Sequence, residues 1–202
     1  MRKGKIIGIL IVVVVIAVAV YSIVVVRRGF SARDNPSWLE STMAGAARSM
    51  AYPSSAKQMQ SPLPATNENL MAGEAHWADH CALCHANNGS GDTVIGKNLY
   101  PKAPDMRKSG TQNMTDGELY YTIQNGVRLT GMPAWGSAGD DDEDTWKLVQ
   151  FIRHLPELTA EEEKHMESLN PKTPEEIQEE RQEQEFLNGQ SEPLKNSQPM
   201  KH

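Results

Sequence analysis

The most pronounced hydrophobic pattern is an unbroken run of 21 uncharged residues, Ile6 to Val26. As a helix rising about 1.5 Å per residue, this run would extend about 31 Å, which matches the hydrocarbon thickness of a bilayer. A cleaved signal peptide is the alternative, but it would have a shorter apolar core that ends at small residues. Ala17 and Ala19 resemble such a site, yet the apolar run continues beyond them. We therefore predict an uncleaved transmembrane anchor over residues 1–28.

Residues 29–65 combine two different patterns. Apolar residues recur at helical spacing between Trp38 and Met50, and Ser37 with Glu40 forms the S-x-x-E pattern of a capping box. This stretch predicts a short amphipathic helix lying near the membrane or on a partner. The residues that follow, 53–64, are rich in Ser, Gln and Pro and are therefore predicted to be a linker.

A compact domain is expected over residues 66–156, and its helical segments are separated by a long irregular stretch. The predicted helices cover residues 68–81, a segment beginning at the Thr115–Glu118 capping box, and residues 144–155 before Pro156. The irregular stretch, residues 86–111, is unusually long for so small a domain. Three short helices also bury too little apolar surface to be stable alone. The pattern indicates an all-α domain whose centre is filled by something other than protein.

The final segment, residues 157–202, is strongly acidic, with 12 acidic and 5 basic residues and few large apolar side chains. This composition predicts an extended or disordered tail outside the core, within which residues 174–188 are compatible with a solvated helix. Basic clusters occur only beside the membrane run and in one short stretch near the domain's motif. Nucleic-acid binding is therefore not expected.

The only two cysteines of the 202 residues, Cys81 and Cys84, form a C-x-x-C-H pattern with His85. This is the pattern of c-type haem attachment, in which two thiols add to the haem vinyl groups and the following histidine is placed beneath the iron. A thioredoxin-like redox pair would require a strand–helix context, and the pattern lies at the end of a helical segment. A structural zinc site would require four ligands, and there is no second cysteine pair. The motif therefore predicts one covalently bound haem.

The opposite face of the iron needs a second ligand, which a methionine or a histidine can supply. Met132 is the leading candidate, because it lies in a predicted loop between Gly131 and Pro133, 47 residues after His85. Met114 is the rival methionine, although most methionines simply fill cores. The histidines that would instead give bis-histidine ligation are His76, His80 and His154. His76 and His80, four residues apart, are also a candidate pair for an additional metal ion, a site that normally requires further ligands.

Four segments together resemble a class I monohaem cytochrome c. They are Cys81-Ala-Leu-Cys84-His85, residues 95–101, the loop 131–135 and the segment 146–152. They are most similar to the small bacterial cytochrome c domains that occur as membrane-tethered electron carriers or as subunits of respiratory complexes. The resemblance covers about residues 69–156, and the haem motif is its most specific part.

The resemblance implies an all-α fold of about three main helices around one haem c, preceded here by the transmembrane helix. It implies covalent attachment through Cys81 and Cys84, His85 as proximal ligand and Met132 as distal ligand. A proline carbonyl that accepts the ring N–H of His85 is also implied. The candidates for that carbonyl are Pro101 and, alternatively, Pro104. Among the tryptophans, Trp135 is a candidate haem contact and Trp146 is expected in the core. Ala86 stands where the family often has glycine.

We expect outer-sphere transfer of single electrons to and from redox partner proteins, with no enzymatic activity and no small-molecule substrate. The resemblance also implies that thioether attachment takes place outside the bacterial cytoplasmic membrane, so the haem domain is expected in the periplasm on a single-pass anchor. The alternatives are a haem enzyme or sensor with a displaceable sixth ligand, as in a peroxidase, and an assembly subunit of a larger complex. The two charged stretches are candidates for partner orientation or ordinary solvated surface. They are Lys97, Lys102, Arg107 and Lys108, and the acidic run 140–144.

Overall fold

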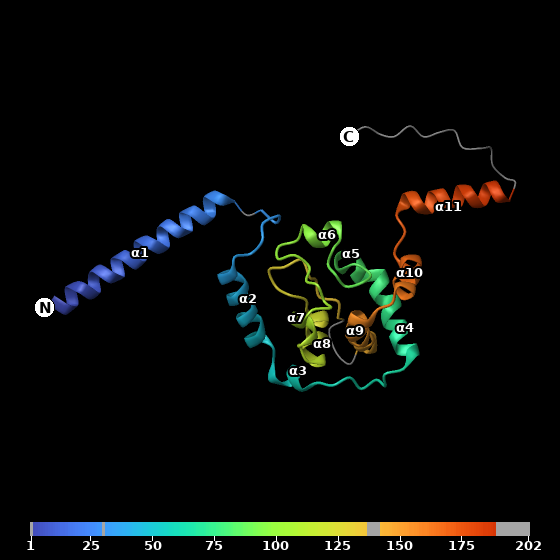
Figure 1. The fold of residues 1–202 in the computed structure, drawn as a ribbon, viewed down its shortest axis with the longest axis horizontal. Helices are drawn as coiled ribbons and strands as arrows, with labels where there is room; N and C mark the ends of the chain where they lie inside the picture. Colours follow the sequence, from blue (N-terminus) through green and yellow to red (C-terminus); the bar gives the residue numbers. More distant parts are fainter. Residues whose placement is uncertain (1, 30, 137–141, 189–202) are drawn as a thin grey trace.

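The computed structural model describes residues 2–29, 31–136 and 142–188, and all regular secondary structure within them is helical. The α-helices are α1 (Arg2–Arg28), α2 (Trp38–Ala51), α3 (Ser54–Gln58), α4 (Asn67–His76), α5 (Ala82–His85), α6 (Val94–Lys97), α7 (Ser109–Gln112), α8 (Asp116–Asn125), α9 (Glu143–His154), α10 (Ala160–Leu169) and α11 (Pro174–Leu187). A π-helical turn, η1 (Trp77–Cys81), and a 3-10 turn, η2 (Leu155–Glu157), complete them. The predicted all-α class is confirmed. Figure 1 shows α1 and α11 extending away from the helical domain that lies between them.

Helix α1 contains the apolar run, and its described side chains project into the surroundings rather than onto the domain. Its segment Gly4–Arg27 is long and apolar enough to cross a membrane. The hydroxyl of Ser22 donates a hydrogen bond to the carbonyl of Val18 at 2.9 Å, so this polar group is satisfied inside the helix. Such internal pairing is what a hydrocarbon environment requires.

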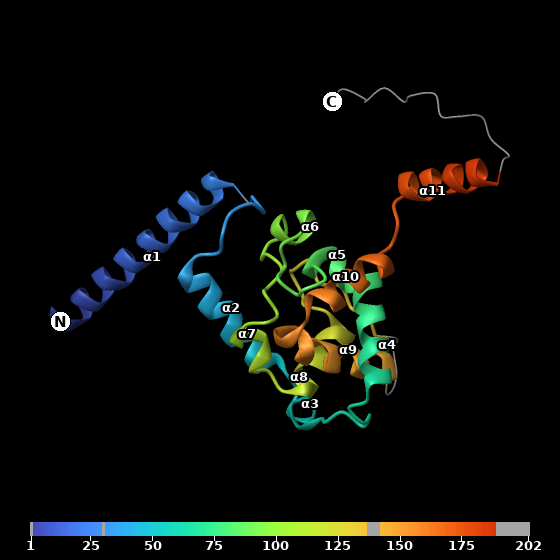
Figure 2. The same cartoon turned by 45° about the vertical axis from the view of Figure 1, so that its right-hand side comes forward.

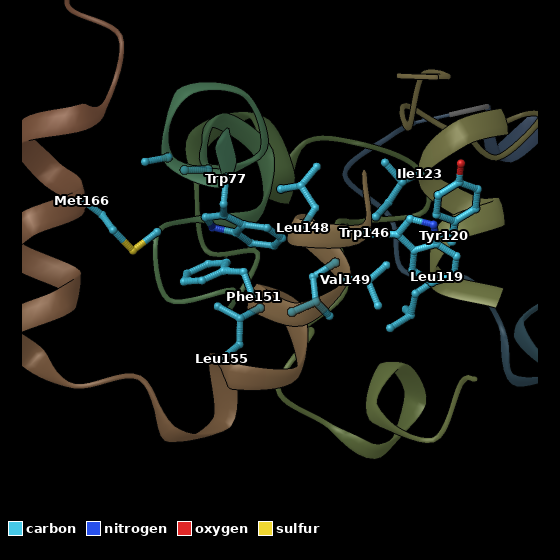
Figure 3. Close-up of a cluster of buried hydrophobic side chains, with 13 residues drawn as sticks. Trp77, Leu119, Tyr120, Ile123, Trp146, Leu148, Val149, Phe151, Leu155 and Met166 are labelled. Carbon is cyan, nitrogen blue, oxygen red and sulfur yellow. The ribbon is translucent and has the colours of Figure 1, made fainter. Parts of the chain in front are cut away.

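The domain core lies where α4 and η1 cross α9, with α8 packed on the other side of α9 (Figure 3). Trp77 contacts Phe151 with ring centroids 5.7 Å apart, and Tyr120 stacks on Trp146 at 4.3 Å. The threonine at position 115 caps α8 in the predicted capping box with Glu118. The three main predicted helices are therefore present, with the first extended through η1 and α5 to His85.

The C-terminal boundary of the domain differs from the expected one at residue 156. Helix α10 packs onto the domain, and Figure 3 shows Met166 reaching from it toward Trp77 and Leu155. Nδ1 of His165 lies 2.8 Å from Oε1 of the buried Glu74, which ties the two helices together. The acidic composition of residues 157–202 predicts a tail, but composition does not reveal a single buried side chain. Met166 alone is buried in α10, and it is enough to attach that helix to the domain. By contrast, α11 has no buried residue, in agreement with the predicted solvated helix.

The predicted linker is also part of the packed structure. Ala56 of α3 is buried against α8, where a side chain at Gly117 would collide with the Ala56 carbonyl. The hydroxyl of Tyr52 is 2.9 Å from Oγ1 of Thr122, and the amide of Gln150 donates to the carbonyl of Leu63 at 3.2 Å. The segment rich in Ser, Gln and Pro is thus not a free linker. It follows the surface of the domain and is attached there by Ala56 and by backbone carbonyls that accept hydrogen bonds.

Candidate haem-binding site

The C-x-x-C-H motif lies at the C-terminal end of a helical run from Asn67 to His85. The run contains the π-helical turn η1, a feature that often occurs at functional positions and widens one turn of the helix. Trp77 in this turn donates a hydrogen bond from Nε1 to the Ala86 carbonyl at 3.1 Å. The buried Trp77 ring also lies 5.7 Å from the ring of His85, between centroids. The buried tryptophan therefore supports the end of the motif directly.

The chain turns sharply after His85 and folds back over the motif. Ala86 has φ 62° and ψ 159°, a region that glycine adopts far more readily than alanine. The Gly91 amide donates to the carbonyl of His85 at 2.8 Å, and a side chain at Gly96 would collide with the carbonyl of Cys84. The irregular stretch is therefore held against the motif by close backbone approach.

A cavity of about 190 Å³ lies beside the motif and has a predominantly apolar lining. Every site residue named from the sequence lines it: Cys81, Cys84, His85, Pro101, Met132 and Trp135. Residues not foreseen from the sequence complete the lining, among them Arg48, Leu99, Val127, Thr130 and Ile152. They come from four separate parts of the chain, so no single local motif identifies them together as a lining. The tertiary structure thus brings the motif and the methionine loop to one cavity.

The surroundings of His85, the candidate axial ligand, favour the neutral ring that can bind a metal ion. Burial lowers its pKa, which favours the neutral imidazole, and a backbone interaction with Pro104 opposes this shift. Nδ1 of His85 is buried and has no hydrogen bond of standard geometry to the described residues. Both candidate prolines line the cavity, and Pro104 is the one whose backbone interacts with the His85 ring.

The two cysteines are unpaired thiols with raised pKa values. Burial, followed by the neighbouring Cys84, raises the pKa of Cys81 to about 12, and burial also raises the pKa of Cys84. Thiol–disulfide exchange and metal binding both use thiolates, which form readily only where the thiol pKa is depressed. No group of three or more metal-binding side chains occurs among the described residues. The environment of the pair therefore favours neither a redox disulfide nor a zinc site.

The loop that carries Met132 is pinned to the end of α8. The amide of Val127 donates to the Met132 carbonyl at 3.1 Å, and the Met132 amide donates to Oγ1 of Thr130 at 3.1 Å. The amide of Trp135 donates to the carbonyl of Ile123 at 3.0 Å. These bonds hold Met132 at the cavity without placing it in the hydrophobic core.

The rival methionine has a different setting. Met114 also lines the cavity but packs against the core, and its carbonyl accepts a hydrogen bond from the guanidinium of Arg153. Met106 likewise lines the cavity and packs against the core. Both side chains are thus held as packing groups. Met132 differs from them because it does not belong to the hydrophobic core cluster of the described residues.

Of the three alternative histidines, only His80 lines the cavity. Its ring lies edge-on to Trp135 at 5.4 Å between centroids, and Nδ1 is 3.1 Å from a carboxylate oxygen of Asp79. His154 pairs instead with Glu162 through Nε2 at 2.9 Å. The His76 ring lies 4.9 Å from that of His80, yet no third ligand accompanies them in the described parts of the chain.

The two tryptophans named from the sequence have separate surroundings. Trp135 lines the cavity and is partly exposed, whereas Trp146 is buried against Tyr120 and does not line the cavity. The indole Nε1 of Trp146 has no hydrogen-bond partner among the described residues.

The charged stretches are largely paired within the domain. Lys97 pairs with Asp92, and Arg107 and Lys108 pair with Asp105. In the acidic run, Asp142 caps α9 and Asp144 pairs with Lys147 at 2.9 Å. Residues 140 and 141 lie outside the described residues. Lys102, which lines the cavity, is the member of the basic stretch without an ion pair to a described residue.

Comparison with known families agrees with this site. The family model for cytochrome C oxidase, cbb3-type, subunit III matches residues 68–152, which run from α4 into α9. This match supports a class I c-type cytochrome domain in the matched region, in line with the sequence resemblance. No curated protein matches the chain.

Proposed function

We propose that this chain is a membrane-anchored periplasmic electron-transfer protein that carries one electron on a single, covalently bound haem c. One observation carries the proposal: Cys81, Cys84, His85 and Met132 line one apolar cavity within a cytochrome c domain. The cytochrome family supports haem-based electron transfer in general. We further propose that there is one haem, that it is bound covalently, and that His85 and Met132 are its ligands.

The residues of the cavity fit a haem c by their chemistry. Cys81 and Cys84 would form the thioether bonds, and the half-buried His85 would bind the iron through Nε2 of its neutral ring, with the backbone of Pro104 near Nδ1. The thioether of Met132, which lines the same cavity, would supply the second protein ligand of the iron. When bound, haem c supplies an iron that takes up and releases single electrons.

The protein surroundings favour electron transfer over chemistry on a substrate. The pinned loop holds Met132 at the cavity, and an iron with both axial positions filled needs little rearrangement when its charge changes. The apolar lining excludes water, which favours the less charged ferrous state. A haem enzyme or sensor would require the sixth position to open, and the hydrogen bonds of the Met132 loop oppose this.

The proposed location rests on α1. A helix that is long and apolar enough to cross a bilayer precedes the domain, and thioether attachment in bacteria occurs outside the cytoplasmic membrane. The domain would then face the periplasm and exchange electrons with protein partners there, including those in a respiratory complex. Retention of the protein in membranes after a high-salt wash would support the anchor, because hydrophobic burial resists salt.

The decisive experiment uses the full-length protein purified from membranes in mild detergent. We expect haem staining at the mass of the chain on a denaturing gel, a one-electron redox titration, and no binding of carbon monoxide to the reduced protein. Haem that is extracted by acidified acetone would contradict covalent attachment. Rapid carbon monoxide binding by the native protein would favour the enzyme or sensor instead.

A further inference from the structure

Helix α2 lies alongside the cytochrome domain in both Figure 1 and Figure 2, and two of its charged side chains, Glu40 and Arg48, contact the domain or its cavity. Glu40 and Arg48 are eight residues apart and therefore lie on one face of the helix, because positions i, i+4 and i+8 are neighbours. Glu40 accepts a hydrogen bond from the hydroxyl of Tyr100 at 2.6 Å, and Arg48 lines the haem cavity. The large apolar side chains of α2, including Trp38 at 80% and Met50 at 79% exposure, are not buried against the domain.

This position of α2 is held at both ends. The Tyr100 bond fixes its first turn, so that Glu40 does not close the predicted capping box and only Ser37 caps the helix. After its last turn, the hydroxyl of Tyr52 is 2.9 Å from Oγ1 of the cavity-lining Thr122. The region before the domain therefore contributes a side chain to the cavity, although α2 itself buries no residue.

Arg48 differs from most basic residues near the cavity because its charge is uncompensated. Its guanidinium has no ion pair or side-chain hydrogen bond to the described residues, whereas Lys97, Arg107 and Lys108 are paired with aspartates. Among the cavity-lining residues, Lys102 is the other lysine or arginine without an ion pair to a described residue. An unpaired guanidinium at an apolar cavity is complementary to an anion that enters the same cavity.

We propose that Arg48 binds a propionate carboxylate of the haem, so that a helix outside the matched cytochrome region completes the cofactor site. The inference rests on the proposed function, because a haem carries two propionates and is the group that the cavity fits. A guanidinium suits this role better than an ammonium, since its planar N–H groups bind both oxygens of one carboxylate. Arg48 thereby connects the membrane-proximal helix to the redox centre.

The test compares Arg48→Gln and Arg48→Lys in the full-length, haem-loaded protein. The matched control is Arg128→Gln, because Arg128 is exposed and adjacent in sequence to the cavity-lining Val127 but is not in the lining. The measurement is the midpoint potential as a function of pH. A nearby guanidinium depresses a carboxyl pKa by about 1–3 units. In Arg48→Gln, we therefore expect the pH at which the potential begins to change to rise by at least about one unit, a tenfold increase in proton affinity.

At pH values where the carboxylate is ionised in both proteins, Arg48→Gln should have the lower potential, because a positive charge that disfavours ferric iron is lost. Arg48→Lys should keep the charge but shift the propionate band in oxidised-minus-reduced infrared spectra, and Arg128→Gln should change neither property. An unchanged pH profile and infrared band in both Arg48 variants, with covalent haem and methionine ligation intact, would overturn this inference and leave the proposed function standing. A full-length protein without covalent haem would overturn both.

Discussion

The two sides of the haem cavity are built in contrasting ways. On one side, His85 ends a continuous helical run whose buried Trp77 packs on α9, and two cysteines precede it. On the other side, Met132 lies in a loop held by a few hydrogen bonds to the end of α8. The first side depends on core packing, which is cooperative, and the second on local bonds that are each worth about 1 kcal/mol. We infer a rigid histidine side and a softer methionine side.

The largest expected effect comes from removing the attachment on the rigid side. The double change Cys81→Ser and Cys84→Ser should abolish covalent haem, because no other cysteine exists in the chain. Haem staining on denaturing gels measures this directly, and unchanged staining would contradict the assignment. The single changes provide a graded comparison, since each retains one possible thioether bond.

The next effect should come from the ligand on the softer side. Met132→Ala should lower the midpoint potential, because a thioether favours ferrous iron, and should let the reduced protein bind carbon monoxide. Met114→Ala is the matched control, since its side chain also lines the cavity but packs against the core, and it should do neither. If Met114→Ala opened the site and Met132→Ala did not, the assignment would be reversed. If neither opened it, His80 would become the candidate ligand.

The rigid side also contains strain, which a glycine should relieve. Ala86 adopts φ 62° and ψ 159°, a region that costs a residue other than glycine about 1–3 kcal/mol. Ala86→Gly should therefore raise the free energy of unfolding by about 1 kcal/mol, after the entropy that glycine loses on folding is subtracted. Ala82→Gly, at helical φ −60°, should lower it by about 1 kcal/mol. Chemical denaturation of the haem-loaded variants measures both free energies of unfolding. A change in the same direction in both variants would contradict the strain at Ala86.

The smallest effect should come from loosening the methionine loop. The Thr130 hydroxyl accepts a hydrogen bond from the Met132 amide and donates one to the Val127 carbonyl at 2.7 Å. Thr130→Ala should cost the loop about 1 kcal/mol and so raise the population with Met132 displaced by about fivefold. Imidazole binding to the ferric protein reports this population. Thr42→Ala, which removes a comparable hydroxyl bond in α2, should leave imidazole affinity unchanged.

Much of the domain was predictable from the sequence because its signals are local. Three signals each involve residues within a few helical turns of one another. They are the capping box at Thr115, the periodicity of α9 and the spacing of the C-x-x-C-H motif. The resemblance to cytochromes added Met132 as the distal ligand, and the structure places that residue in the same cavity as the motif. The ligation itself stays a prediction.

Other features follow only from contacts between distant segments. Helix α10 joins the core through Met166, although its acidic composition predicts a tail, and the Pro-rich residues before α4 wrap the domain through backbone carbonyls. Glu40 leaves its predicted capping partner for Tyr100, and α2 thereby turns Arg48 to the cavity. A sequence pattern specifies which residues share a face of a helix, but which face is buried depends on the partners that the fold supplies.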